Sequence, residues 1–373
     1  MNRQRLLSTL RELVELPGVP GHEGPVRAYI KQELEKCGVE SIFIDRIGNL
    51  VAKKEGSNPS APSVLLDAHM DEPGFIVKYM SPEGYLYLNQ VGYVNDSVLP
   101  GQRFVVLTRS GPVRAVSGVK SFHLTTSEER TQPPSWENIW LDVGARNREE
   151  SRKMGIRIGD PIVFERDFAE LANDLVTGKG LDNRIGCAVA LETVRELAKK
   201  PHDSAVYVSA TVQEEMVLRG ARVIFADLKG VFQAVPDFAI VYDISLAGDF
   251  PEVKPHISPI SIGGGPTIKV FDRSRANPSL GIIVSPKVVD LMSAIAETNE
   301  IPYQYEVHHT ISTNSDIFHM EDTGVLTAGI SIPCRYTHTP TEVVSLLDAA
   351  NAVKLSLATI EKLPEVFESL LPE

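Results

Sequence analysis

Two side chains of the kind that bind metals stand together at the end of an apolar run. The run Val64-Leu-Leu-Asp-Ala leads into His69, and Asp71 follows two positions later. In an extended chain, side chains at i and i+2 lie on one face, so Asp71 can orient the His69 imidazole as a metal ligand. A strand that leaves the core through a polar turn has the same pattern. This segment alone leaves both interpretations open.

Two further segments deliver acids to the end of a strand or the start of a helix. The glycine-rich loop Gly178-Lys-Gly-Leu brings Asp182 to a helix start, where a capping aspartate is the simpler interpretation. The run Val206-Tyr-Val-Ser-Ala-Thr-Val-Gln is too apolar for a surface strand and ends in Glu214 and Glu215. If the chain stays extended, these two glutamates project to opposite sides. One could then bind a metal while the other handles a proton.

One more carboxylate and a histidine complete the set. Asp243 ends the apolar run Phe238-Ala-Ile-Val-Tyr, a position that a turn residue also explains. His338 is either a metal ligand or a surface loop histidine. Residues 339–342, which follow it, are predicted to be the cap, first turn and capping box of the last helix. Open α/β sheets bind substrates where the carboxyl ends of their strands meet. The whole set therefore predicts one site more strongly than any member does.

The charges of the set favour bound cations. The acids concerned are Asp71, Asp182, Glu214, Glu215 and Asp243. Carboxylates that crowd one cleft raise each other's pKa values unless positive charge is present, and two divalent ions would offset most of the repulsion. Oxygen and imidazole ligands without thiolates suit zinc, cobalt or manganese.

The elements that must position these residues differ along the chain. Helices and buried strands interleave before residue 74 and after residue 167, whereas the stretch between has short strands separated by Gly, Pro and Ser turns, typical of a small β-barrel or sandwich. At 373 residues the chain exceeds the roughly 250 to 300 residues of a single core. We therefore predict an α/β fold, a mixed sheet flanked by helices. The catalytic domain would comprise residues 1–73 and 168–373, with a small β-barrel domain inserted at 74–167.

Periodicity places the individual elements. Leu6, Leu10 and Leu13 form a helical stripe near the N-terminus. Residues 122–138 lack any period and are expected to form a long loop that either reaches a neighbouring active site or lies idle on the surface. Further helices are expected at 25–36, 185–199, 286–299 and from 340, and strands at 41–45, 48–53, 64–66, 84–88, 103–107, 112–116, 161–164, 205–212, 238–242 and 325–332.

Composition excludes several classes of partner. The chain has 37 basic and 49 acidic side chains, a net charge of −12, and no basic patch, so nucleic acid is not expected to bind. Cys37, Cys187 and Cys334 are too few and too far apart for a disulfide framework, which fits a reducing compartment. No apolar run approaches the roughly 18 residues of a membrane span, and charges interrupt the N-terminal segment before a signal-peptide core could form. We expect a cytoplasmic protein without membrane contact.

Taken in order along the chain, these motifs resemble those of the tetrahedral aminopeptidases, a family of cytosolic exopeptidases with two metal ions, some of which carry glucanase names. The resemblance covers nearly the whole chain, including the inserted β region. The matching segments are Ala68-His-Met-Asp-Glu, Gly180-Leu-Asp-Asn-Arg, Gln213-Glu-Glu with Arg219-Gly-Ala, Val241-Tyr-Asp and Arg335-Tyr-Thr-His-Thr-Pro.

The resemblance implies a metal ligand set. Asp182 would bridge two divalent ions, with zinc or cobalt expected. His69 and Asp243 would complete one site, and Glu215 and His338 would complete the other. The family further implies a homo-oligomer built from dimers, up to a hollow dodecamer.

The resemblance also implies a reaction, the removal of N-terminal residues from oligopeptides. Glu214 would be the general base for a metal-bridged hydroxide that attacks the first peptide carbonyl, and Asp71 would support His69. The peptide bond between Asp182 and Asn183 is expected to be cis, as in the family.

Two alternatives of other classes stay open at this stage. A glycoside hydrolase would use two carboxylates about 5 to 9.5 Å apart, but it leaves His69 and His338 unexplained. A catalytically silent assembly protein could share the same scaffold. The chain also departs from the family pattern at Pro73, at Met216-Val217 and at Thr313-Asn-Ser-Asp316, positions that concern the substrate pocket and leave the metal ligands intact.

Overall fold

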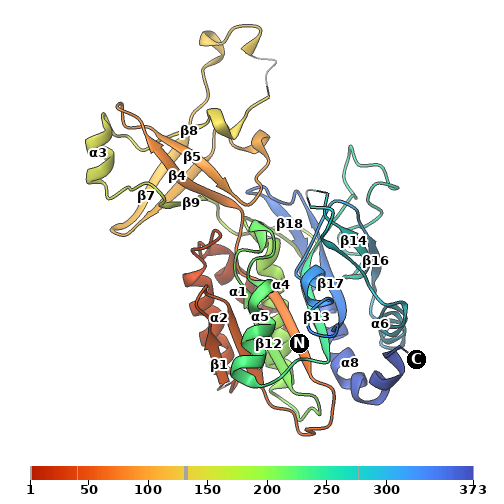
Figure 1. The fold of residues 1–373 in the computed structure, drawn as a ribbon. Coiled ribbons are helices and arrows are strands. Elements are labelled where there is room, and N and C mark those ends of the chain that lie inside the picture. Colours follow the sequence, from red (N-terminus) through yellow and green to blue (C-terminus); the bar gives the residue numbers. More distant parts are fainter. Residues whose placement is uncertain (1, 40, 130–132, 276, 373) are drawn as a thin grey trace.

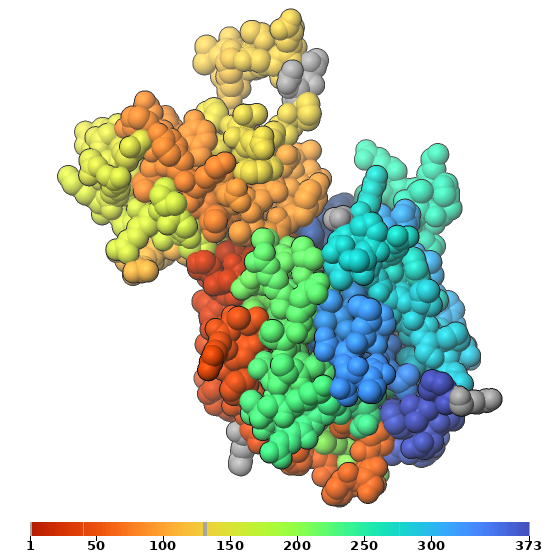
Figure 2. All heavy atoms as spheres, in the orientation of Figure 1, coloured from red at the N-terminus to blue at the C-terminus, as the bar shows by residue number. Residues whose placement is uncertain are grey.

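The chain forms a layered α/β body with a β-barrel standing on top of it (Figure 1). The computed structural model describes residues 2–39, 41–129, 133–275 and 277–372. In the space-filling view the barrel, coloured orange to yellow-green, rises from one end of the body (Figure 2). A mixed sheet with helices and a closed barrel confirms the predicted fold class.

Parallel strands at the centre of the sheet set the position of the site. Because these strands are buried along almost their whole length, their sequences are continuous apolar runs rather than alternating ones. Thr211 lies opposite His69, and Leu246 lies opposite Cys334, so the carboxyl ends of neighbouring strands meet at one edge. In spatial order the strands are β12 (Val206–Thr211), β3 (Val64–His69), β13 (Phe238–Leu246) and β17 (Leu326–Arg335).

Further strands extend the sheet on both sides. Beside β12 lie β2 (Leu50–Lys54) and β1 (Ser41–Ile44), and beyond β17 follow β18 (Glu342–Ser345), β11 (Leu175–Gly178) and β10 (Ala169–Glu170). A branch that periodicity did not predict leaves β17 and consists of β14 (Thr267–Arg273), β15 (Gly281–Ile283) and β16 (Gln304–Val307). The loop that joins β14 to β15 contributes to the wall of the site described below.

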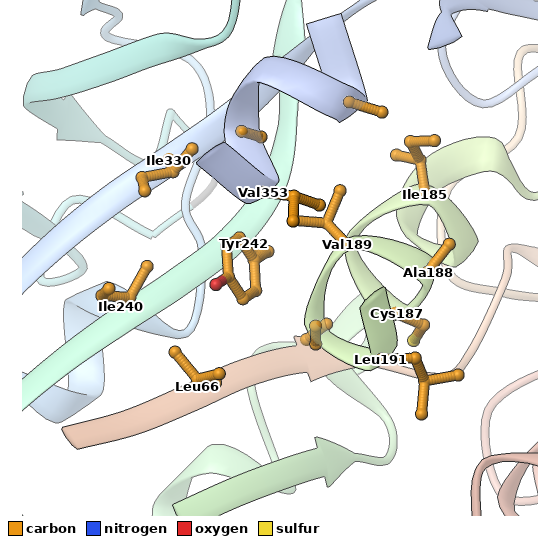
Figure 3. Close-up of a cluster of buried hydrophobic side chains, with 14 of the residues drawn as sticks. Leu66, Ile185, Cys187, Ala188, Val189, Leu191, Ile240, Tyr242, Ile330 and Val353 are labelled. Atoms are coloured by element: carbon orange, nitrogen blue, oxygen red, sulfur yellow. The ribbon is translucent and has the colours of Figure 1, made fainter. Parts of the chain in front are cut away.

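Helices cover both faces of the sheet. One face packs against α1 (Arg3–Glu15), α2 (Gly24–Lys36), α4 (Leu181–Leu197), α6 (Pro286–Thr298) and α8 (Leu346–Leu370), and the other against α5 (Ala221–Asp227) and α7 (Ser315–Phe318). Figure 3 shows Leu66 and Tyr242 of the sheet meeting Val189 of α4 and Val353 of α8. The predicted N-terminal stripe is fully buried in this core. In the part of the chain that the structure describes, none of these helices is both long and apolar enough to cross a bilayer.

The barrel has its own aromatic core. Phe75, Phe104 and Phe164 pack with ring centroids 4.8 to 6.2 Å apart. A short helix, α3 (Arg148–Lys153), lies at its side (Figure 1). Its strands close in the order β4 (Gly74–Met80), β5 (Leu86–Val91), β8 (Trp140–Asp142), β7 (Gly111–Ser117), β6 (Arg103–Thr108) and β9 (Pro161–Phe164).

The predicted loop projects from the barrel away from the α/β body (Figure 1). Its described parts, 122–129 and 133–138, contain short 3-10 turns at Phe122–Leu124 and Trp136–Asn138. Residues 130–132 of the predicted loop lie outside the described residues.

The last helix begins later than predicted. Residues Glu342–Ser345 form β18, and α8 starts at Leu346, where the Ser345 hydroxyl caps it by accepting from the backbone N–H groups of the first turn. The predicted capping box at residues 339–342 is therefore wrong. The β-branched pair Val343-Val344 is better accommodated in the sheet, where it pairs with both β11 and β17.

Candidate metal centre

The site residues predicted from the sequence converge at the carboxyl edge of the parallel strands. Every group of three His, Cys, Asp or Glu donors within 4.8 Å that occurs among the described residues is drawn from this set. Their carriers are β3 (His69), the turn after it (Asp71), the first turn of α4 (Asp182), the turn after β12 (Glu214 and Glu215), β13 (Asp243) and the turn after β17 (His338).

The Asp182 carboxylate lies between two histidines. Its Oδ1 is 3.3 Å from His69 Nε2, and its Oδ2 is 3.2 Å from His338 Nε2. The simple capping interpretation is wrong, because the side chain that caps the regular part of α4 is that of Asn183, whose Oδ1 accepts a hydrogen bond from Gly186 N at 3.1 Å. The peptide bond between Asp182 and Asn183 is cis, as the resemblance implied. A carboxylate with one oxygen toward each imidazole is placed to bridge two cations.

The other acids divide between the two histidines. Asp243 Oδ2 and Glu214 Oε2 lie 4.0 and 3.9 Å from His69 Nε2, and Glu215 Oε1 lies 3.3 Å from His338 Nε2. Glu215 Oε1 is buried, and apart from its contact with His338 Nε2 no hydrogen bond to it is found within the described structure. Because a buried carboxylate oxygen is costly unless donors or positive charge face it, a cation at this point would be stabilising. The oxygen and imidazole donors fit a pair of divalent ions.

The two glutamates do not continue the strand. Gln213 has a φ of 53°, and Glu214–Met216 form a 3-10 turn, so the expectation of an extended chain is wrong here. Both glutamates line the same cavity instead of pointing to opposite sides. The carboxylate of Asp71 fixes this turn, because its two oxygens accept hydrogen bonds from the N–H groups of Glu214 and Glu215, each at 3.0 Å.

His69 is oriented through its other ring nitrogen. His69 Nδ1 is 3.2 Å from the backbone oxygen of Asp71 and 3.6 Å from its carboxylate Oδ1. Both contacts leave Nε2 facing Asp182. Behind Asp71, the buried Glu23 accepts hydrogen bonds from the N–H groups of Gly21 and Gln213 at 2.7 and 3.1 Å, and burial followed by the charge of Asp71 raises the pKa of Glu23 to about 7.

Sequence analysis missed one residue of the site, Glu342. Its Oε1 accepts a hydrogen bond from His338 N at 2.7 Å, and its Oε2 accepts one from Asp182 N at 3.0 Å. Burial, followed by the charge of Asp182, raises the pKa of Glu342 to about 8. An acid directly before the β-branched pair at 343–344 is the signal that could have placed it on a strand beside the ligands.

The site concentrates charge as predicted. Burial is the main reason why the pKa of Asp243 is raised to about 8 and that of Glu214 well above its usual range. The charge of His69 opposes this rise, and the neighbouring carboxylates add to it. For Asp182 burial acts in the same direction, but the hydrogen bonds with His338 and His69 outweigh it and keep the pKa of this carboxyl below its usual range. The two imidazoles therefore favour the ionised form of Asp182, whereas Asp243 and Glu214 favour the neutral form as long as no further positive charge enters the site.

A cavity of about 480 Å³ opens onto this cluster. Its floor includes Asp182, Glu214, Glu215, Asp243 and His338, so the acids and one histidine are accessible to a ligand. A cleft with convergent acids of shifted pKa at the carboxyl ends of parallel strands is the expected form of a catalytic site.

Comparison with known families agrees with this geometry. The family model of the M42 glutamyl aminopeptidases matches residues 48–355, which include the barrel and the whole acid–histidine cluster. The chain belongs to the M42 aminopeptidase family. It is therefore a hydrolase that acts on peptide bonds, and the resemblance drawn from the sequence motifs is confirmed.

A relative and several solved structures resemble almost the whole chain. The lysyl aminopeptidase of Pyrococcus furiosus is 32% identical over 95% of this chain and 96% of its own. The TET aminopeptidase of a Thaumarchaeota archaeon has a TM-score of 0.91 and 32% identity, covering 100% of both chains. The Pyrococcus horikoshii TET1 peptidase, described as assembling into a tetrahedron or a large octahedral shell, has a TM-score of 0.83 and 27% identity over 96% of this chain and 100% of its own. A Thermotoga maritima protein named endoglucanase has a TM-score of 0.74 and 30% identity over 97% and 99%.

Proposed function

We propose that this M42 protein is a dinuclear metal-dependent aminopeptidase that removes N-terminal residues from oligopeptides. The observation that carries the proposal is the Asp182 carboxylate, whose two oxygens face His69 Nε2 and His338 Nε2 at 3.3 and 3.2 Å. The family match supports peptide substrates, and the convergence of acids supports binding of a free α-amine.

The ligand set of the proposal has two halves. His69 and Asp243 would hold one divalent ion, Glu215 and His338 the other, and Asp182 would be shared. Zinc or cobalt suits these oxygen and nitrogen donors. When bound, such ions polarise a carbonyl and lower the pKa of water.

Glu214 is the proposed general base. Its carboxylate lines the cavity beside His69 and belongs to neither half of the ligand set. It would take a proton from the attacking water and later deliver it to the leaving amine. Asp71 keeps Glu214 in place through the hydrogen bond to its backbone N–H.

The barrel is proposed as an inserted domain of residues 74–167 that serves assembly. The similarity to the TET1 peptidase supports a homo-oligomer built from dimers, with a dodecamer as the form to test. A cytoplasmic location is proposed from composition and from the absence of a disulfide among the cysteines, each of which is free.

Removal of metal is expected to abolish activity. Incubation with a chelator followed by desalting should remove most turnover of amino-acid anilides with a free amine, and added zinc or cobalt should restore it. Peptides with a blocked N-terminus should not be cleaved in either state. Cello-oligosaccharides test the glycoside hydrolase alternative, and hydrolysis of these sugars that persists in chelator would contradict the proposal, as would failure to cleave any peptide with metal added.

Substitution of the bridging residue tests the ligand set directly. Asp182→Asn should lower the metal content from about two ions per chain to one or fewer, because an amide does not carry the charge that both half-sites share. Elemental analysis of the purified protein measures this. The exposed Asp142→Asn is the matched control and should keep its metal. Full occupancy in Asp182→Asn would rule out the bridging role.

A further inference from the structure

Outside the acid–histidine cluster, part of the cavity lining is apolar. The aliphatic side chains there are Val217, Ile244, Leu246, Leu280 and Ile311. The other described lining residues outside the cluster are Tyr93 and side chains with hydroxyl or amide groups, and none of them is charged. We call these five aliphatic residues the aliphatic wall. Charge in this cavity is thus confined to the end where the metal ligands lie.

A nearby lysine is not available to pair with a substrate in the cavity. Lys269 does not line the cavity, and only 1% of its surface is exposed. Its ammonium pairs with Asp272 and lies 3.2 Å from Glu306 Oε1, and it donates a hydrogen bond at 3.2 Å to the hydroxyl of Thr313, which does line the cavity. The three acceptors saturate the ammonium, so it has no hydrogen-bond donor left for a substrate in the cavity.

A second cation near the cavity, Arg275, does not line it. Arg275 follows Ser274, a lining residue, but it is exposed and does not contribute to the lining. The aliphatic wall also includes a position where this chain departs from the family pattern, Val217. The selectivity of this chain therefore has to be inferred from its own wall.

From this wall we propose that the enzyme prefers peptides whose first residue has an uncharged aliphatic side chain, such as leucine or methionine, over peptides that begin with glutamate or lysine. The inference rests on the proposed aminopeptidase function. With the α-amine and the first carbonyl held at the acidic end, the first side chain would extend along the aliphatic wall. A carboxylate or ammonium there would lose its hydration without gaining a partner of opposite charge. The family description names glutamyl activity and the Pyrococcus furiosus relative is named for lysine, so this chain would differ from both.

A panel of anilides tests the preference on the metal-loaded enzyme. The value of kcat/KM for leucine anilide should exceed those for glutamate and lysine anilides by roughly 10- to 200-fold. If the glutamate or the lysine anilide has the highest kcat/KM, this inference is overturned and the aminopeptidase function stands. If glutamate leads and Arg275→Ala abolishes that lead, an exposed arginine reaches the substrate and the inference is wrong. No turnover on any member would overturn the proposed function and this inference together.

Charges placed in the aliphatic wall provide a second test. Ile311→Lys should raise the glutamate-to-leucine ratio of kcat/KM by roughly tenfold, and Ile311→Asp should raise the lysine-to-leucine ratio similarly. Ile311→Asn is the neutral control and should favour neither charge. The same pair of substitutions at Val217, which is 54% exposed and tolerates a charge without threatening the fold, repeats the test at the rim. Unchanged ratios in both pairs would show that the side chain binds elsewhere and would overturn the inference.

Discussion

Glu214→Gln is expected to lower kcat by about 10²- to 10⁴-fold, because the amide cannot accept the proton of the attacking water. The substitution preserves the size of the side chain, and the backbone N–H of residue 214 still donates to Asp71, so the turn should stay in place. Metal content should not change, since the two half-sites are formed by other residues. Kinetics on leucine anilide, elemental analysis and thermal unfolding together measure these three properties.

A matched control separates loss of the base from loss of charge. Glu365→Gln removes a carboxylate from the exposed face of α8, far along the chain from the cavity, and should keep full activity. Wild-type turnover in a metal-replete Glu214→Gln protein would reject the assignment of the base. Loss of metal in the same variant would instead make Glu214 a ligand.

The second large effect concerns stability. Lys269→Met is expected to lower the free energy of unfolding by about 3 to 5 kcal/mol, because it leaves buried carboxylates without a counter-charge. Burial lowers the pKa of Lys269, but the charges of Asp272 and Glu306 outweigh this effect and raise the pKa above its usual range. Lys269 is therefore charged in the folded state. Asp316 lies in the same cluster with both carboxylate oxygens buried and unpaired, and burial followed by Asp272 raises its pKa to about 8. Urea unfolding monitored by circular dichroism measures the loss.

An exposed lysine serves as the control for this prediction. Lys229 pairs with Asp322 at 2.7 Å, but its side chain is 46% exposed. Lys229→Met should therefore change stability by no more than about 1 kcal/mol. A similarly small change in Lys269→Met would mean that the acids around it take up protons and no longer need the ammonium.

Much of the architecture could be predicted because its signals are local. The apolar runs of β3, β12 and β13 end at His69, before Glu214 and at Asp243, and parallel strands necessarily bring such ends to one edge. The short strands of the barrel are bounded by glycine and proline turns, which periodicity detects. The site residues could be named from this pattern and from the family motifs.

What could not be predicted depends on contacts between distant segments. Glu342 lies on a strand only because its strand, β18, pairs with β11 on one side and with β17 on the other. Its local sequence favours a helix start equally well. The turn at Glu214 depends on the left-handed Gln213. It is held by the N–H group of Gln213, which donates to Glu23, and by that of Glu214, which donates to Asp71. The acceptors that surround the Lys269 ammonium come from β14, from β16 and from the segment before α7. No periodicity in the sequence links these three segments.

The first and last strands of the barrel are neighbours, since Phe75 of β4 pairs with Ile162 of β9. The polypeptide therefore departs from the α/β body and rejoins it at adjacent points, although the 80 residues 81–160 intervene between these two strands. This arrangement makes the barrel modular, because its size and surface can change while its two connections to the α/β body stay in place. The barrel, which we propose to serve assembly, could thus be remodelled without altering the strand end that carries His69 and the helix start that carries Asp182.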